Sequence, residues 1–407
     1  MSTADHSRSE PAPAASEIAA QLCEADFVRL VTTPDGDALA ATGVLAQTLT
    51  VPFQASVARN EVGESEADMT VTIGRADGNV AIIEEPLSVR AFEVAQALNE
   101  SESDNSNSES ESESDSNSIS DPGPVLVLAL AGIVAAERDL SAHTDAFDIE
   151  ATDIDSTPGI GVPTTDLADG LAHTTLVHAP FSGDLEAATE VLSDIVPDSA
   201  TPDLDEHGRV VASMLALSVV REAKTRASET IDRAVCPYGV AEVGGTTQLP
   251  FATLAGYADV LDALARSWPG IGLALALGHD CYEAALDGWR EHARAAHTAI
   301  HNADISRYRG LVVADITETT SESGTIGTVA RLVRDYRSQE PVVLAIADDA
   351  VAGTAVERER DVTAALTEAV AAVDEKASAT GRGRYAYAQS AITTRKDAFV
   401  DAFREAI

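Results

Sequence analysis

Two aspartates stand one residue apart at the end of a short apolar segment. The segment Phe27–Thr32 is predicted to be a strand, the next turn carries Asp35 and Asp37, and a helical pattern begins at Ala38. Carboxylates at the C-terminal end of a strand lie where open α/β sheets bind ligands. Alternate aspartates around Gly36 can direct several oxygens to one Mg²⁺ or Mn²⁺ ion, which prefers oxygen ligands. Asp35 and Asp37 are therefore candidates for a metal or phosphate site. The alternative is that they only shape the turn.

Histidines form a second candidate group. His292, His297 and His301 lie on one predicted helix, and His297 and His301 are four residues apart. Such a pair can share one helix face, as metal-binding pairs do. Because the sequence has no HExxH motif and shows no third ligand, we expect these side chains to pack or to face solvent.

The charge of the chain is strongly negative. Its 407 residues include 67 acidic and 27 basic ones, which gives a formal net charge of −40. The only lysines are Lys224, Lys376 and Lys396, so the other basic residues are arginines. This composition is typical of proteins that work in molar salt, where a Debye length of about 3 Å screens self-repulsion. Net charge therefore does not exclude nucleic acid as a partner, but any binding groove must be a local arginine cluster.

Strand-like and helix-like segments alternate along the chain, which favours an α/β fold with a parallel sheet and crossover connections. Val125–Leu130 and Ile271–Leu277 are predicted as two further, strongly apolar strands. Residues 99–121 contain no apolar residue before Ile119 and should be disordered. No apolar run reaches membrane-spanning length, and the N-terminus lacks the apolar core of a signal peptide. A soluble, cytoplasmic protein is therefore expected.

A chain of this length is expected to form at least two domains. We predict a disordered tail, a parallel-sheet α/β domain interrupted by an acidic, serine-rich loop, a long connecting helix and a smaller C-terminal α/β domain. The predicted boundaries are 1–15 for the tail, 16–200 for the first domain with its loop at 99–121, 201–235 for the connecting helix and 236–407 for the C-terminal domain.

The turn Pro34–Ala38 resembles the first motif of the DHH phosphoesterase superfamily, which includes RecJ exonucleases, nanoRNases and the archaeal nuclease that binds the GINS replication complex. The resemblance implies the architecture given above, with a DHH-type N-terminal domain and a DHH-associated C-terminal domain. It also implies that Asp35 and Asp37 are catalytic residues and metal ligands. In active members, two Mn²⁺ or Mg²⁺ ions activate water and neutralise the phosphate.

The other catalytic motifs of the superfamily are missing. Val31, Thr32 and Thr33 stand where the family has its first histidine, and no Asp-His-His triplet occurs in the chain. After the predicted strand Val125–Leu130, the first acid is Glu137, several residues late for the family's third aspartate. These departures indicate a degenerate catalytic centre.

A glycine-rich segment near the C-terminus is placed like the family motif that contacts the nucleic-acid backbone. The segment is Thr380–Ala388, and it keeps glycines and small residues but lacks the family histidine. Arginines can contact phosphates and tyrosines can stack on a base. The candidate nucleic-acid-binding residues are Gly381, Arg382, Gly383, Arg384 and Tyr385, with Tyr387 nearby. The alternative is an ordinary turn and edge strand.

By this resemblance, the chain is interpreted as a RecJ-like protein of DNA replication or repair that has lost catalysis and binds GINS or other replication proteins. It would then need no metal cofactor. A competing hypothesis is an active exonuclease specific for single strands, or a small-nucleotide phosphodiesterase, that depends on Mn²⁺ or Mg²⁺. A third is a module that holds a nucleotide without hydrolysing it.

Overall fold

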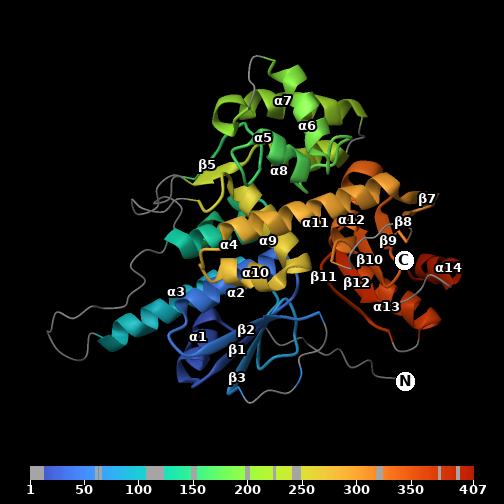
Figure 1. Cartoon of the computed structure of the whole chain (residues 1–407). Helices are drawn as coiled ribbons and strands as arrows, with labels where there is room; N and C mark the ends of the chain where they lie inside the picture. The colour runs from blue at the N-terminus through green and yellow to red at the C-terminus, as the bar shows by residue number, and fades with distance from the viewer. Residues whose placement is uncertain are drawn as a thin grey trace.

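The structure is a computed structural model with two α/β units and a helical region packed above them (Figure 1). Most of the predicted tail and most of the predicted loop at 99–121 lie outside the described residues, although helix α1 begins at Ala15 and helix α3 continues to Ser106. The described residues are 13–59, 63, 67–106, 123–147, 154–197, 202–222, 226–240, 249–317, 324–374, 377–390 and 395–407.

A four-stranded parallel sheet forms the base of the N-terminal unit, as the sequence predicted. The strand order is β2-β1-β3-β4. The next strand in the chain, β2, pairs with one edge of β1, and the following strand, β3, pairs with its other edge. The C-terminal end of β1 is therefore a switch point of the sheet, which is where open α/β sheets bind ligands. The strands are β1 (Val28–Thr32), β2 (Phe53–Val57), β3 (Met69–Ile73) and β4 (Val80–Ile82).

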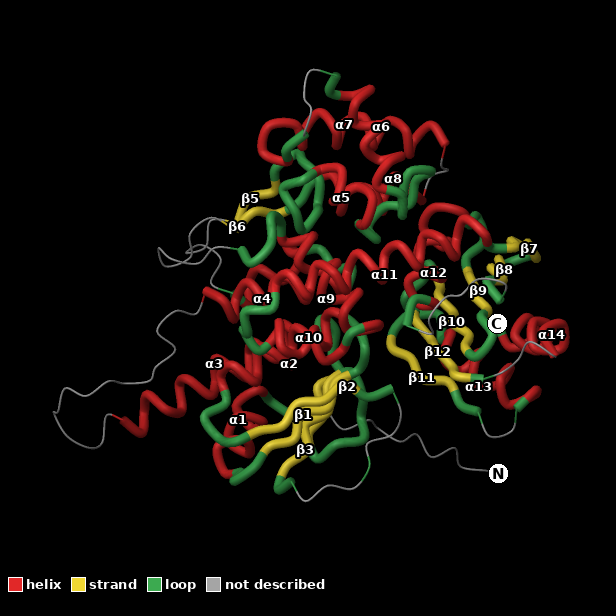
Figure 2. Tube along the Cα trace, viewed as in Figure 1, coloured by secondary structure: helices red, strands yellow, loops and turns green. Residues whose placement is uncertain are grey.

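Small and aliphatic side chains pack the helices of this unit closely. The tube view shows α2, α4, α9 and α10 above the sheet (Figure 2), and residues of all four join one apolar core. Gly43 allows α2 to approach α10, because a Cβ there would lie 2.4 Å from the Ala276 carbonyl oxygen. The helices are α1 (Ala15–Glu24), α2 (Gly36–Thr48), α3 (Leu87–Ser106), α4 (Gly123–Ala135), η1 (Leu140–Ala146), α9 (Leu254–Ser267) and α10 (Pro269–Ala276).

Two strands predicted from the sequence are helices in the structure. Val125–Leu130 belongs to α4 and Ile271–Leu277 falls largely in α10. α4 is surrounded by other helices, and its residues from Val125 to Ile133 are all buried. A helix that is apolar on every side carries no 3.6-residue pattern, so periodicity cannot distinguish it from a buried strand.

The middle of the chain folds into a smaller helical region with its own apolar core. Where one connecting helix was expected over residues 201–235, two helices pack against each other. The elements of this region are β5 (Ile154–Ser156), α5 (Leu167–His173), α6 (Leu185–Ile195), α7 (Leu204–Glu222), α8 (Arg226–Val235) and β6 (Tyr238–Val240).

The long helix that leads to the C-terminal unit is α11 (Tyr282–Asn302), which crosses the centre of the molecule in Figure 1. The described part of the chain has no helix that is long and apolar enough to cross a membrane. By packing, α9 and α10 belong to the N-terminal core. The domain boundaries given from the sequence stay a prediction.

A mixed six-stranded sheet forms the C-terminal unit, with the order β11-β12-β10-β9-β8-β7. One core joins the sheet to α13 and α14, and a second joins its other face to α11 and α12. The expected α/β fold, with a parallel N-terminal sheet, a long helix and a smaller C-terminal unit, is thus confirmed. The elements are β7 (Asp304–Tyr308), β8 (Leu311–Asp315), α12 (Ile326–Leu332), the π-helical turn η3 (Val333–Arg337), β9 (Val342–Ile346), β10 (Ala350–Ala355), α13 (Val362–Val373), β11 (Ala379–Arg382), β12 (Tyr385–Gln389) and α14 (Lys396–Ala406).

Candidate functional site

Asp35 begins helix α2 at the C-terminal end of β1. Its Oδ1 accepts a hydrogen bond from the backbone N–H of Ala38 at 3.0 Å, which makes it the N-cap of the helix. Its Oδ2 accepts a bond from the Thr33 hydroxyl at 2.8 Å. An aspartate N-cap satisfies one of the free N–H groups at a helix start. The turn chemistry predicted for Asp35 is therefore present.

Asp37 is buried and caps a different helix. Its side chain is 1% exposed, and its two oxygens accept bonds from the backbone N–H groups of Leu87 at 2.8 Å and Ser88 at 2.9 Å, at the start of α3. Burial raises the pKa of the Asp37 carboxyl, while the nearby Arg382 guanidinium acts to lower it. Asp37 thus ties α2 to α3.

Arg382 reaches this pair of aspartates from the C-terminal sheet. Its Nη2 donates to Asp35 Oδ1 at 2.7 Å, and its Nη1 lies 3.1 Å from Glu85 Oε1 and 3.5 Å from Asp37 Oδ2. Burial acts to lower the pKa of Arg382, but the three carboxylates hold that pKa above its usual value. A fixed positive charge therefore lies among the carboxylates that the sequence proposed as metal ligands.

These residues do not fit a two-metal centre. The oxygens of Asp35 and Asp37 accept bonds from backbone N–H groups, a hydroxyl and a guanidinium. Two bound metal ions would need several more carboxylates or histidines around them. In the described part of the chain, no group of three or more His, Cys, Asp or Glu side chains could hold a metal ion.

Strand alternation explains why Arg382 points into the cleft. Successive side chains of a strand point to opposite faces of its sheet, and in the hairpin β11–β12 Thr380 pairs with Tyr387 and Arg382 with Tyr385. These four residues line the cleft between the two units. Ala388, on the other face, belongs to the apolar core beneath α13 and α14. Of the residues predicted to bind nucleic acid, Arg382, Arg384 and Tyr385 have intramolecular partners, and their nucleic-acid role stays a prediction.

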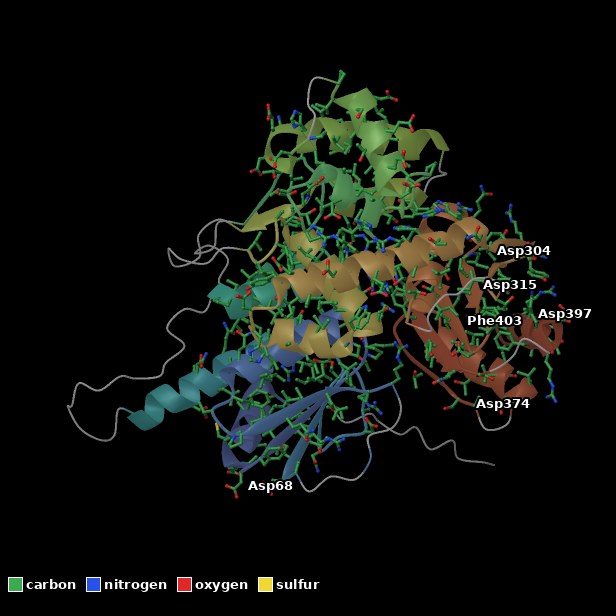
Figure 3. All side chains as sticks on the ribbon, in the orientation of Figure 1. Asp68, Asp304, Asp315, Asp374, Asp397 and Phe403 are labelled. Atoms are coloured by element: carbon green, nitrogen blue, oxygen red, sulfur yellow. The ribbon has the colours of Figure 1, made fainter. Side chains whose placement is uncertain are left out.

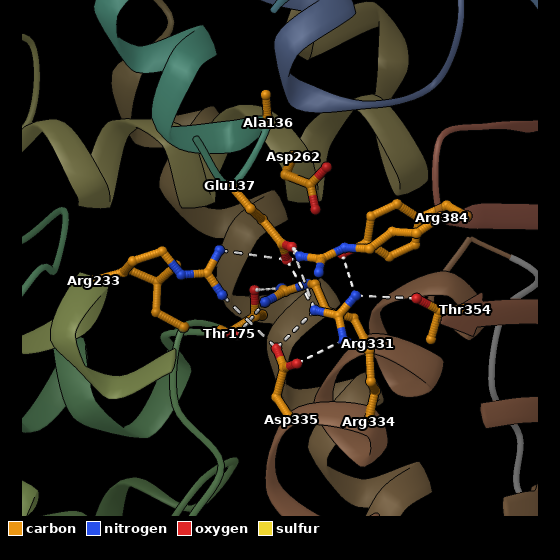
Figure 4. A network of polar contacts seen from close by, with 12 residues as sticks. Ala136, Glu137, Thr175, Arg233, Asp262, Arg331, Arg334, Asp335, Thr354 and Arg384 are labelled. Carbon is orange, nitrogen blue, oxygen red and sulfur yellow. Dashed lines mark hydrogen bonds and ion pairs between the residues drawn. The ribbon is translucent and has the colours of Figure 1, made fainter. Parts of the chain in front are cut away.

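Deeper in the cleft, Glu137 is surrounded by arginines (Figure 4). It follows α4, and its φ of 56° is a left-handed conformation that residues other than glycine seldom adopt. Arg334 donates to it at 3.2 Å, Arg233 lies 3.5 Å away, and Arg384 forms a further ion pair. The Tyr385 hydroxyl also donates to it, at 2.7 Å. Glu137 was the late acid noted in the sequence, and in the structure it links all three regions.

Side chains fill most of this inner part of the cleft. The remaining cavity is about 60 Å³, enough for very few water molecules, and is lined by six arginines and five carboxylates. One of its pairs is Asp262 with Arg266, bonded at 2.9 and 3.0 Å, and Asp262 also accepts from the Gly36 N–H at 3.1 Å. The inner cleft is therefore a network of neutralised charges.

A larger cavity of about 400 Å³ opens beside Arg382. Its lining includes Arg59, Arg75, Arg266 and Arg382, and among the described residues its only carboxylate is that of Asp35. The sequence required a local arginine cluster for any contact with nucleic acid, and the cleft brings one together.

Many acids lie instead on the outer surface of the molecule. Asp68, Asp304, Asp374 and Asp397 are exposed at the edges of the two units (Figure 3). The overall charge of −40 thus does not describe the cleft.

Two histidines of α11, His292 and His297, are buried in the packing, whereas His301 is exposed. His297 is fully buried, its Nδ1 lies 3.1 Å from the Nδ1 of His178, and its Nε2 lies 3.0 Å from the Thr174 carbonyl oxygen. Burial lowers the pKa of His178 to about 2 and that of His297 to about 4. Both rings are neutral at pH 7, and the described residues offer no metal cluster around them. This agrees with the packing role expected for His297.

A curated relative covers nearly the whole chain. The uncharacterized protein rrnAC1427 of Haloarcula marismortui is 42% identical over 408 residues, which cover 98% of this chain and 98% of that protein. The chain belongs to the rrnAC1427 family. The family model described as the C-terminal domain of uncharacterized protein rrnAC1427 also matches residues 303–405.

Solved structures with this fold come from the DHH superfamily. CDC45 from Entamoeba histolytica has a TM-score of 0.56 and 10% sequence identity, and the match covers 93% of this chain and 95% of that one. RecJ from Thermus thermophilus, solved in complex with Mg²⁺, has a TM-score of 0.47 and 14% identity, with 96% of this chain and 52% of that chain covered. The likeness to CDC45 establishes the fold, as the motif at Pro34–Ala38 implied.

Sequence reasoning found Asp35 and Asp37 but missed the residue that completes their site from the N-terminal unit. Glu85 follows β4 and precedes Pro86, and nothing in its local sequence marks it as part of a site. Arg382 was predicted as a nucleic-acid contact, and the structure gives it carboxylate partners within the chain.

Proposed function

We propose that this protein is a catalytically degenerate, RecJ-like member of the DHH superfamily that acts in DNA replication or repair as a structural partner of GINS. The observation that carries the proposal is the position of the Arg382 guanidinium, within 3.5 Å of oxygens from Asp35, Asp37 and Glu85. The proposal includes a cytoplasmic location.

The charges at this position support a loss of catalysis. Hydrolysis by two metal ions needs carboxylates that are free to coordinate cations and to activate water. A bound guanidinium supplies one positive charge but cannot lower the pKa of a water molecule as a coordinated metal does. Because Arg382 already neutralises the carboxylates, a divalent cation would have to displace it and break three ion pairs.

A structural role is supported by the ion pairs that join the regions. Glu137 binds Arg233 from the middle region and both Arg334 and Arg384 from the C-terminal unit. Such a network holds the cleft in one geometry, which suits a subunit that presents a fixed surface. The choice of GINS as the partner rests on the superfamily resemblance and on the CDC45-like fold.

Capture of GINS in molar KCl tests the proposal. We expect tagged protein to retain GINS from the same organism, and the Asp35→Asn variant to retain it equally, because Asn keeps the N-cap and removes only the charge. The same preparations are incubated with single-stranded DNA and Mn²⁺. Absence of GINS binding contradicts the partner, and degradation of DNA that is lost in Asp35→Asn would establish the competing exonuclease hypothesis.

A further inference from the structure

We propose that a surface along helix α11 binds an acidic segment of another protein through two exposed arginines, Arg294 and Arg337. Arg294 lies on α11, and Arg337 is the last residue of the π-helical turn η3. These arginines and the neighbouring His173, His178 and His301 are called the α11 surface. The inference goes beyond the proposed function and does not depend on GINS as the partner.

Each of the two arginines is held by a histidine instead of a carboxylate. Arg294 Nη2 donates to His173 Nε2 at 3.4 Å, and Arg337 Nη2 donates to His178 Nε2 at 3.2 Å. Within the described residues, the two guanidinium groups make no other hydrogen bond or ion pair. A guanidinium has five N–H donors, so each arginine can still bind an acceptor from outside the chain.

His178 is fixed as an acceptor by its other bond. His178 and His297 are buried and neutral, and His297 Nε2 donates to the Thr174 carbonyl oxygen at 3.0 Å. His297 Nδ1 therefore accepts from His178 Nδ1 at 3.1 Å, which leaves His178 Nε2 to accept from Arg337. This chain of bonds holds the Arg337 guanidinium in one orientation at the surface.

The second pair is built in the same way, about two helical turns away. Because arginine only donates, His173 Nε2 accepts from Arg294, and its Nδ1 donates to an Asp169 carboxylate oxygen at 3.0 Å. The first pair lies by His301, whose ring centre is 5.1 Å from that of His178. Since seven residues of an α-helix separate Arg294 from His301, the two pairs are about 10 Å apart along α11.

A neutral imidazole orients a guanidinium without cancelling its charge. Arg290, one turn before Arg294, shows the contrast, because its ion pairs with Asp169 and Asp287 neutralise it. Burial alone lowers the pKa of Arg337, and no carboxylate of the described residues offsets this effect. The positive charges of Arg294 and Arg337 thus remain available to a partner.

An acidic protein segment fits this surface by charge and by spacing. Two strongly acidic proteins repel each other, and this chain has a formal net charge of −40, so contact requires a local positive surface. In an extended segment, carboxylates three residues apart are separated by about 10 Å, which matches the two arginines. Proteins hold nucleic acid through a longer run of phosphate contacts, whereas this surface offers two fixed charges.

Fluorescence anisotropy of a labelled peptide with the full chain in molar KCl tests the surface. The peptide is made of glycine and serine with aspartate at every third position, and its control carries asparagine at the same positions. We expect the aspartate peptide to bind at least about tenfold more tightly, because only it forms charge-assisted hydrogen bonds with the arginines. A labelled single-stranded oligonucleotide is measured in parallel.

Three variants at exposed positions locate the contact. Arg294→Gln and Arg337→Gln each remove one positive charge of the α11 surface, whereas Arg404→Gln removes one on α14. We expect each of the first two to weaken the aspartate peptide about tenfold and Arg404→Gln to leave it unchanged. Urea unfolding of all three variants checks that the fold is retained.

Several outcomes would overturn the inference. The first is absence of binding by the aspartate peptide, and the second is equal binding of the asparagine control. Equal affinity in Arg337→Gln and Arg404→Gln would place the peptide elsewhere. Tighter binding of the oligonucleotide that is lost in Arg337→Gln would make the occupant a nucleic acid. Self-association in sedimentation velocity that is lost in the same variant would make it a second copy of the chain.

Discussion

Removal of the Arg382 guanidinium should destabilise the protein and create affinity for a divalent cation. Arg382→Ala would remove the counter-charge that Asp35, Asp37 and Glu85 share, and only Glu85 would keep other arginine partners, Arg138 and Arg358. Like charges at this distance repel each other, and a Mn²⁺ ion can take the place of the guanidinium because it prefers oxygen ligands.

The size of the effect follows from burial. Breaking a buried ion pair by removing one partner costs about 3–5 kcal/mol, whereas an exposed pair contributes about 0–1 kcal/mol. The side chains of Arg382, Asp35 and Glu85 are 20%, 23% and 19% exposed, so the pairs are largely but not fully buried. We therefore expect the free energy of unfolding to fall by about 3 kcal/mol. Saturating Mn²⁺ at about a hundred times its dissociation constant would return about 2.7 kcal/mol to the variant.

Urea unfolding at constant KCl, with and without MnCl₂, measures both effects. Urea is uncharged, so the ionic strength that screens these charges stays fixed. Arg404→Ala is the control, because its ion pair with Asp401 is largely exposed at 43% and 69% and should change stability by less than about 1 kcal/mol. If Arg382→Ala is as stable as Arg404→Ala, or if Mn²⁺ stabilises wild type as much as the variant, the role assigned to Arg382 is wrong.

Three further predictions concern neighbouring groups. Glu137→Gln should lower stability in urea by about 3 kcal/mol, because it leaves several arginines at a 7% exposed position without their counter-charge, whereas no change would contradict the network. Asp37→Ala should cost about 2 kcal/mol or more, since two N–H groups at the start of α3 lose their acceptor, and rescue by Asp37→Asn of more than half that loss would argue against a role for the charge. The folded-state pKa values of His178 and His297 lie below the unfolded value of about 6.5, so the unfolded state binds more protons and stability should fall as the pH drops from about 6.5 toward 4. His178→Asn should flatten this slope in urea titrations, and an unchanged slope would show that His178 binds protons equally in the folded and unfolded states.

The turn that carries Asp35 and Asp37 could be predicted from the sequence because its hydrogen bonds join residues that are close together in the chain. The cap at Asp35 and the turn before α2 depend on residues that adjoin in the chain. The strand–turn–helix pattern also places Asp35 correctly at the switch point of the parallel sheet. In the hairpin β11–β12, alternation of side chains brings Arg382, Tyr385 and Tyr387 to one face, as strand geometry requires.

The remaining contacts of the site join residues that are far apart in the chain, and no spacing in the sequence indicates them. Asp35 and Arg382 are 347 residues apart, and their contact exists only because the C-terminal sheet packs on the switch point. Glu85 joins the site from a loop whose sequence contains no recognisable motif. The segments at α4 and α10 were mistaken for strands because both are apolar throughout and carry no amphipathic signal; α4 is buried on all sides, whereas α10 is buried only in part. The acid that the family pattern places at the end of a strand is therefore replaced here by Glu137, which follows helix α4.

Anomalous diffraction from crystals soaked in MnCl₂ is the most direct measurement of the central claim. We expect no manganese peak beside Asp35 and Asp37, and continuous density for the Arg382 guanidinium between them and Glu85. One or two manganese ions bridging the two aspartates, with Arg382 moved away, would contradict it.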